Sequence, residues 1–74
     1  MIIKDKQIGK IYKVINNLDS YWLAKDIFGE IIAVNKMQAY EITPADEATM
    51  SETEYALYRK SLRYLERYEG LSQK

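Results

Sequence analysis

Cysteine and histidine are both missing from this chain of 74 residues. Without cysteine no disulfide can form, and a structural zinc site would need carboxylate ligands alone, which is rare. Neither a Ser–His nor a Cys–His nucleophile pair is available, and the commonest general base is absent. The three glycines, Gly9, Gly29 and Gly70, lie too far apart to form a phosphate-binding loop. We therefore expect a protein that is not an enzyme, with no catalytic residue, no cofactor and no metal.

An excess of charge of either sign is also missing. Lysine plus arginine number 11, as do aspartate plus glutamate, so the formal net charge is zero. This balance argues against a strong nonspecific attraction to nucleic acid or to an acidic membrane. No apolar run approaches the roughly 20 residues that span a bilayer, and the apolar residues 1–3 are followed at once by charged ones, unlike a signal peptide. A cytoplasmic location is the default expectation.

A chain of this length makes one domain, residues 1–74, near the lower limit for independent folding. Because disulfides and metals are excluded, association is the remaining way to stabilise so small a core. Such association could be with a second copy of the chain or with a larger partner protein.

The first 43 residues have the character of short strands. β-branched and aromatic residues are frequent in residues 8–15, 21–25, 30–34 and 38–42, and turn-forming residues separate these segments. Asp26 and Gly29 bracket one tight turn, where glycine can take a positive φ. In the strand predicted over residues 30–34, the last four residues (Ile31, Ile32, Ala33 and Val34) are apolar on both faces, which predicts a central strand. Residues 1–3 could add a short edge strand. The regular spacing predicts a β-meander over residues 1–43 that curls into a small barrel.

The last third of the chain predicts one long helix. Thr43 and Pro44 end the sheet, and residues 44–50 could be a helical turn or a connecting loop. Ser51 followed by Glu54 fits a capping box at the start of a helix over residues 51–70, and Gly70 fits a left-handed C-terminal stop. The expected fold class is therefore α+β: a small antiparallel sheet of four to five strands, packed by one long C-terminal helix.

This helix has more apolar surface than one small sheet can cover. Four residues at helical spacing are predicted to pack on the sheet: Tyr55, Tyr58, Leu62 and Leu65. A neighbouring stripe, about 100° around the helix, contains Leu57, Tyr64, Tyr68 and Leu71. Tyrosine combines a large apolar area with a polar tip, so it tolerates water before binding and gains on burial. We predict that this second stripe contacts a partner protein or a second copy, unless a strongly curved sheet covers both stripes.

A basic stripe lies beside the apolar ones and consists of Arg59, Lys60, Arg63 and Arg67. Four cations at helical spacing could follow the phosphates of a nucleic acid or an acidic protein surface, and a solvated helix face is the simpler interpretation. Trp22 poses a similar choice. It is interpreted first as a core anchor, and otherwise as an exposed platform for bases or a proline-rich peptide, with Tyr12 and Tyr40 nearby.

Several short motifs resemble a known family. In order they are Gly9-Lys10-Ile11-Tyr12-Lys13-Val14-Ile15, then Tyr21-Trp22-Leu23, then Asp26-x-x-Gly29-Glu30, then Tyr40-Glu41-Ile42. This order is similar to that of the small SH3-like barrel domains found in short phage and Gram-positive proteins. The resemblance covers residues 7–43 and implies an SH3-like curled barrel without catalytic residues. The fully apolar third strand and the long helix depart from that pattern.

The resemblance and the helix surface together suggest a function. The chain is expected to be a non-enzymatic protein-binding module, in the form of a phage or mobile-element regulator or inhibitor, for example of the anti-CRISPR type. It would cover a surface of a larger protein in the host cytoplasm through the apolar and basic stripes of the helix, or pair with itself as a dimer. The alternative is a nucleic-acid-binding SH3-like module that uses the helix arginines and the sheet aromatics.

Overall fold

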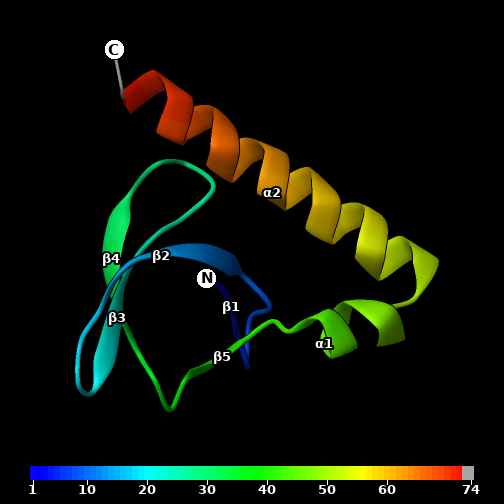
Figure 1. Cartoon of the computed structure of the whole chain (residues 1–74), viewed down its shortest axis with the longest axis horizontal. Helices are drawn as coiled ribbons and strands as arrows, with labels where there is room; N and C mark the ends of the chain where they lie inside the picture. Colours follow the sequence, from blue (N-terminus) through cyan, green and yellow to red (C-terminus); the bar gives the residue numbers. More distant parts are fainter. Residues whose placement is uncertain (73–74) are drawn as a thin grey trace.

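Five antiparallel strands form one sheet, and two helices follow it within the described residues (Figure 1). The computed structural model describes the backbone of residues 1–72 and the side chains of residues 1–66. The elements are β1 (Ile2–Asp5), β2 (Ile11–Asn17), β3 (Tyr21–Lys25), β4 (Ile31–Asn35), β5 (Ala39–Glu41), α1 (Pro44–Thr49) and α2 (Glu52–Ser72). The prediction of an α+β fold with a small antiparallel sheet and a C-terminal helix is confirmed.

The order of the strands across the sheet is β4-β3-β2-β1-β5, which differs from expectation at two positions. The first strand is not an edge: β1 lies between β2 and β5, and Ile3 at its centre is fully buried. The third predicted strand is not central, because β4 pairs only with β3 among the described strands. Both errors have one cause, which is that β5 returns to pair with β1. The Lys6 N–H donates to the Gln38 carbonyl at 2.9 Å and the Ile42 N–H to the Ile2 carbonyl at 2.9 Å.

The sheet is not closed into a barrel, so this part of the prediction is wrong. Closure would require the two outer strands, β4 and β5, to pair with each other, and they stand at opposite ends of the strand order. Since β5 has only three residues and leads directly into Thr43 and Pro44, it offers too short a ladder to complete a barrel. The result is an open sheet, in which β4 and β5 are the outer strands among the described residues.

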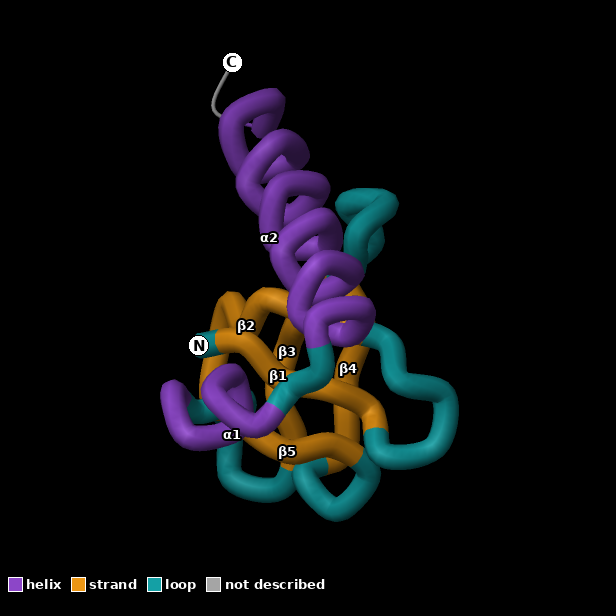
Figure 2. Tube along the Cα trace, turned by 90° about the vertical axis from the view of Figure 1, so that its right-hand side faces the viewer, coloured by secondary structure: helices purple, strands orange, loops and turns teal. Residues whose placement is uncertain are grey.

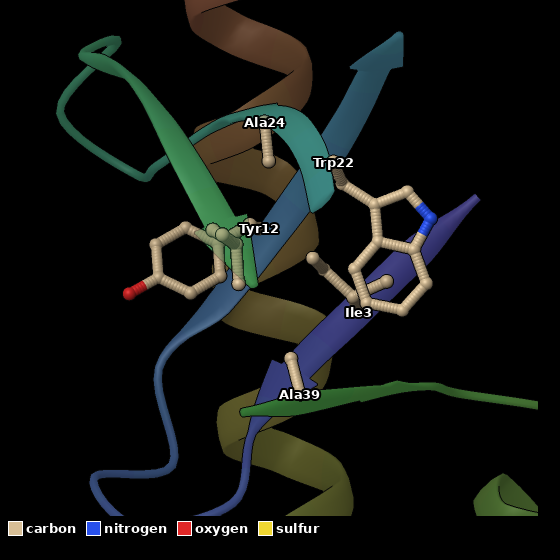
Figure 3. Close-up of a cluster of buried hydrophobic side chains, with 6 residues drawn as sticks. Ile3, Tyr12, Trp22, Ala24 and Ala39 are labelled. Carbon is tan, nitrogen blue, oxygen red and sulfur yellow. The ribbon is translucent and has the colours of Figure 1, made fainter. Parts of the chain in front are cut away.

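The core lies on one face of this sheet and is formed by Ile3, Tyr12, Trp22, Ala24, Val34 and Ala39. Figure 3 shows Tyr12 and Trp22 extending to opposite sides of Ile3. Trp22 is 8% exposed, which confirms its role as a core anchor. The Lys36 Nζ lies 5.6 Å from the centroid of the Trp22 ring, so the ammonium shields one face of the indole. Burial raises the pKa of Tyr12, and the nearby carboxylates of Asp5 and Asp26 raise it further.

Both helices begin with a side-chain cap. In α1 the Thr43 Oγ1 accepts from the Asp46 N–H at 3.3 Å and the Thr43 N–H donates to the Asp46 carboxylate at 2.8 Å, a complete capping box. In α2 the Ser51 Oγ accepts from the Glu54 N–H at 3.2 Å, so the predicted cap is confirmed. Gly70 does not end the helix, however, because the helical backbone continues to Ser72. A glycine in the left-handed conformation ends a helix where the chain must change direction. No such change is needed here, because α2 extends past the sheet (Figure 2).

Residues 44–50, for which the sequence left helix and loop open, contain helix α1. Neither helix, as far as the chain is described, combines the length and the apolar character that crossing a bilayer requires.

Candidate contact surface on the C-terminal helix

One face of α2 packs on the sheet, mainly against β2. Tyr58 and Leu65, two turns apart, are 5% and 1% exposed, and Leu62 between them is half-buried. Three of the four residues predicted to pack on the sheet are therefore at least partly covered. Tyr55 is the exception at 41% exposed. The first turns of α2 follow α1 and stand away from the sheet (Figure 1), so the Tyr55 ring packs instead on Tyr58, with 6.4 Å between the ring centroids.

Tyr58 also joins the two helices. Burial raises the pKa of its hydroxyl, and the Glu47 carboxylate of α1 raises it further through its charge and a hydrogen bond. The Arg59 guanidinium acts in the opposite direction. The neutral hydroxyl is therefore the favoured form, and it holds the first part of α2 against α1.

The predicted contact stripe remains uncovered where the structure describes it. Leu57 is 61% exposed and Tyr64 is 40% exposed, and the basic side chains of Arg59, Lys60 and Arg63 are exposed as well. The other predicted contact residues, Arg67, Tyr68 and Leu71, lie outside the described side chains. The sheet thus covers one stripe of the helix, and the neighbouring stripe faces outward.

Leu57 and Tyr64 form one wall of a groove, which we call the α2 groove. It has a volume of about 400 Å³ and is lined by Ile27, Phe28, Leu57, Lys60, Ser61 and Tyr64. Four of these residues come from α2 at positions that share one helix face, and the other two come from the turn between β3 and β4. Figures 1 and 2 both show this turn beside α2. A smaller cavity of about 110 Å³ adjoins it and reaches Gly9 and Ile11 at the start of β2.

The opposite wall of the α2 groove is built on Asp26. This carboxylate is 7% exposed, and its Oδ1 accepts from the N–H groups of Phe28 and Glu30, both at 2.9 Å. Gly29 takes a φ of 84°, which lets the chain reverse within the predicted tight turn. The turn holds the Phe28 ring at the rim of the groove with 68% of its surface exposed.

The sequence interpretation missed the contribution of Ile27 and Phe28. The available signal was their position, because the centre of an exposed turn normally carries polar residues or glycine. Two large apolar residues at that place indicate a contact made by the turn itself.

The chain matches no family model, no curated protein and no solved structure. The α2 groove is apolar, with one ammonium from Lys60 and the hydroxyls of Ser61 and Tyr64. Within the described residues no three acidic side chains gather at a possible metal site. Such a lining is suited to holding an apolar group beside a negative charge.

The sheet aromatics do not form the platform that a base-stacking mode requires. Trp22 and Tyr12 are 8% and 4% exposed, and they belong to the core. Tyr40 keeps 37% of its surface exposed on the short outer strand β5. A nucleic-acid interface would therefore depend on the exposed arginines of α2 without the two buried rings.

Proposed function

We propose that this protein is a non-enzymatic binding module that attaches to a larger protein through the α2 groove. The observation that carries the proposal is the set of large apolar side chains left uncovered around one groove, namely Phe28, Leu57 and Tyr64. Apolar side chains clustered at one concave place are typical of the anchors of protein interfaces.

The size of these anchors fits a specific complex. Burying a leucine or phenylalanine side chain contributes about 1.5–3 kcal/mol, and a micromolar complex requires about 8 kcal/mol. Phe28, Leu57 and Tyr64 are 68%, 61% and 40% exposed, so completing their burial supplies part of the necessary free energy, and the other contacts of the interface supply the rest.

The charges around the groove indicate the chemistry of the partner. Lys60 lies in the lining, and Arg59 and Arg63 are exposed on the same helix. A complementary surface would insert an apolar side chain between Phe28 and Leu57 and place carboxylates against these cations. A cytoplasmic regulator or inhibitor, such as an anti-CRISPR protein, that covers a functional surface of a host protein is one biological form of such a module.

The proposal is tested by comparing two tyrosines of the same helix. Tyr64 lines the α2 groove, whereas Tyr55 is equally exposed, at 41% against 40%, and lies outside it. Affinity capture from host lysate is done with the natural chain, with Leu57→Ala plus Tyr64→Ala, and with Tyr55→Ala. We expect the double variant to lose the captured protein and Tyr55→Ala to retain it, with a fall in affinity of at least tenfold by calorimetry. Equal capture by all three chains would refute the groove as the binding site.

A nucleic-acid-binding role has one observation in its favour, the exposed cluster of Arg59, Lys60 and Arg63. Salt distinguishes the two functions. Binding to a mixed-sequence oligonucleotide, followed by fluorescence anisotropy, would weaken steeply between 50 mM and 200 mM salt. Binding through the apolar α2 groove would change little over this range. A steep response that survives Leu57→Ala plus Tyr64→Ala would favour the nucleic-acid role.

A further inference from the structure

The outer edge of β4 is open and carries none of the usual protection. β4 ends the strand order, and within the described residues only β3 pairs with it. Outer strands are normally kept from pairing by charges, proline, bulges or short length. β5, at the other end of the sheet, is short and is followed by Pro44. β4 has five residues, Ile31-Ile32-Ala33-Val34-Asn35, without charge, proline or bulge.

The hydrogen-bonding groups at this edge can be assigned from the ladder on the other side. The Asp26 N–H donates to the Glu30 carbonyl at 2.9 Å, and the Lys36 N–H donates to the Ser20 carbonyl at 3.1 Å. Because the groups of an antiparallel strand alternate in direction, residues 30, 32, 34 and 36 direct theirs toward β3. The register is regular along the whole pair, so the groups of Ile31 and Ala33 and the N–H of Asn35 point to the open edge, while the Asn35 carbonyl accepts from the Gln38 N–H at 2.9 Å.

The side chains along this strand are complementary to a second copy of the same strand. If two copies of β4 run antiparallel with Ala33 opposite Ala33, Glu30 of one copy stands opposite Lys36 of the other, at both ends of the pair. A parallel arrangement would instead set like charges against each other. If the register of the two β4 strands shifted by one residue, backbone groups that point to the open edge would face groups that point toward β3, and no ladder could form. If it shifted by two residues, Glu30 would no longer stand opposite Lys36 at either end.

The small side chain at the centre of β4 also favours this pairing. Ala33, at the centre, is small and exposed and allows the two backbones to approach.

We propose that the protein forms a two-fold symmetric dimer by antiparallel pairing of β4 with β4 of a second copy, which joins the two sheets into one. The two copies of Ala33 then exchange hydrogen bonds, and the Asn35 N–H of each copy donates to the Ile31 carbonyl of the other. This interface does not include the α2 groove, so the dimer proposal is independent of the proposed binding function.

The first test is the mass in solution. Light scattering over a range of concentrations should give twice the chain mass of 8.7 kDa and dissociation on dilution. Ala33→Pro removes an N–H that points away from β3, so the fold should persist by circular dichroism while the dimer is lost. Leu57→Ala plus Tyr64→Ala should leave the dimer intact. A monomer at every concentration would overturn the proposal, as would a dimer that survives Ala33→Pro or depends on the helix residues.

The second test uses the charge pairs and does not depend on how the proline variant folds. Glu30→Lys alone and Lys36→Glu alone each place like charges across the interface, and we expect the dissociation constant to rise roughly tenfold to a hundredfold. Mixing the two variants should restore association, because a lysine of one chain then faces a glutamate of the other at both ends of the pair. Native mass spectrometry detects this mixed dimer. Failure of the mixture to associate better than either variant alone would contradict the register.

Amide exchange gives a residue-level readout. In the dimer the N–H groups of Ala33 and Asn35 should be protected, and dilution should abolish that protection while the N–H groups of Ile32 and Val34 stay protected by β3. Equal protection of both sets at low concentration would refute the assignment of the open edge.

Discussion

Leu65→Ala and Leu57→Ala make the same chemical change on the same helix, and the structure predicts opposite results. Leu65 is 1% exposed and packs toward the sheet, whereas Leu57 is 61% exposed at the α2 groove. Truncating a buried leucine costs about 2–5 kcal/mol, which combines the lost transfer free energy with the cavity that remains. Because α2 packs mainly against one strand, β2, its surroundings can partly collapse, and we expect about 2–3 kcal/mol for Leu65→Ala.

That loss is a large part of the total for so small a domain. At about 0.05–0.15 kcal/mol per residue, the free energy of unfolding is roughly 4–11 kcal/mol. A domain of this size loses about 4–8 °C in Tm per kcal/mol, so Leu65→Ala should lower Tm by roughly 10–20 °C. Leu57→Ala removes an exposed group and should change the free energy of unfolding by less than about 0.5 kcal/mol.

The assay is urea and thermal unfolding followed by circular dichroism, with all chains at one concentration because association would shift Tm. The intrinsic helix preference of alanine slightly exceeds that of leucine and is the same in both variants, so it cancels in the comparison. Similar losses from the two variants, or a larger loss from Leu57→Ala, would show that α2 is rotated relative to the sheet. The assignment of the α2 groove would then be wrong as well.

Three further predictions concern pH and the turn. The pKa values of Tyr58 and Tyr12 are raised in the folded state, so the stability that these tyrosines contribute is present below their ordinary pKa of 10.0 and is lost as pH rises through the folded pKa. In an alkaline titration, the tyrosinate absorbance at 295 nm and the unfolded fraction should therefore increase over the same pH range. Hydrogen bonds from Thr43 lower the pKa of Asp46, so its contribution is present above the ordinary value of 3.8 and is lost as pH falls; Asp46→Asn should flatten the acid limb of a stability–pH curve. Gly29→Ala forces a side chain to a φ of 84° and should cost about 1–2 kcal/mol by urea unfolding, whereas no loss would mean that the turn relaxes.

The features that the sequence predicted well are local ones. The turn from Asp26 to Gly29, the cap at Ser51 and the segments of β3 and α2 depend on neighbouring residues, and the structure contains all of them. Strand boundaries differed by a few residues, as in β2, which begins at Ile11 although the apolar pattern starts at Ile8. Ile8 is 64% exposed in the turn before β2, where the Asp5 carboxylate accepts its N–H at 2.9 Å.

Strand order was the feature that the pattern could not determine. An apolar strand such as residues 30–34 indicates cover on both faces, but it does not identify what provides that cover. The decisive contact is between residues far apart in sequence: Ile3 pairs with Glu41, which places β1 inside the sheet and leaves β4 outside.

The candidate site was half predictable for the same reason. Helical spacing identified Leu57 and Tyr64 as a surface distinct from the stripe that packs on the sheet, and both remain exposed. The opposing wall of Ile27 and Phe28 depends on how α2 crosses the turn between β3 and β4, which is a tertiary arrangement. Tyr55 was wrongly assigned to the core because periodicity gives the direction of a side chain but not the distance to the sheet.

The pairing of β1 with β5 also governs the order of folding. Strands β2, β3 and β4 are joined by short turns and can assemble as a meander from local contacts, whereas β1 has no complete place until β5 arrives beside it. We therefore expect the meander to form early on a ribosome and the buried Ile3 to dock late, once residue 41 has emerged from the exit tunnel. A bulky protein fused ahead of Met1 should slow the docking of β1 between β2 and β5. The same protein fused after the helix should leave the rate of this step unchanged.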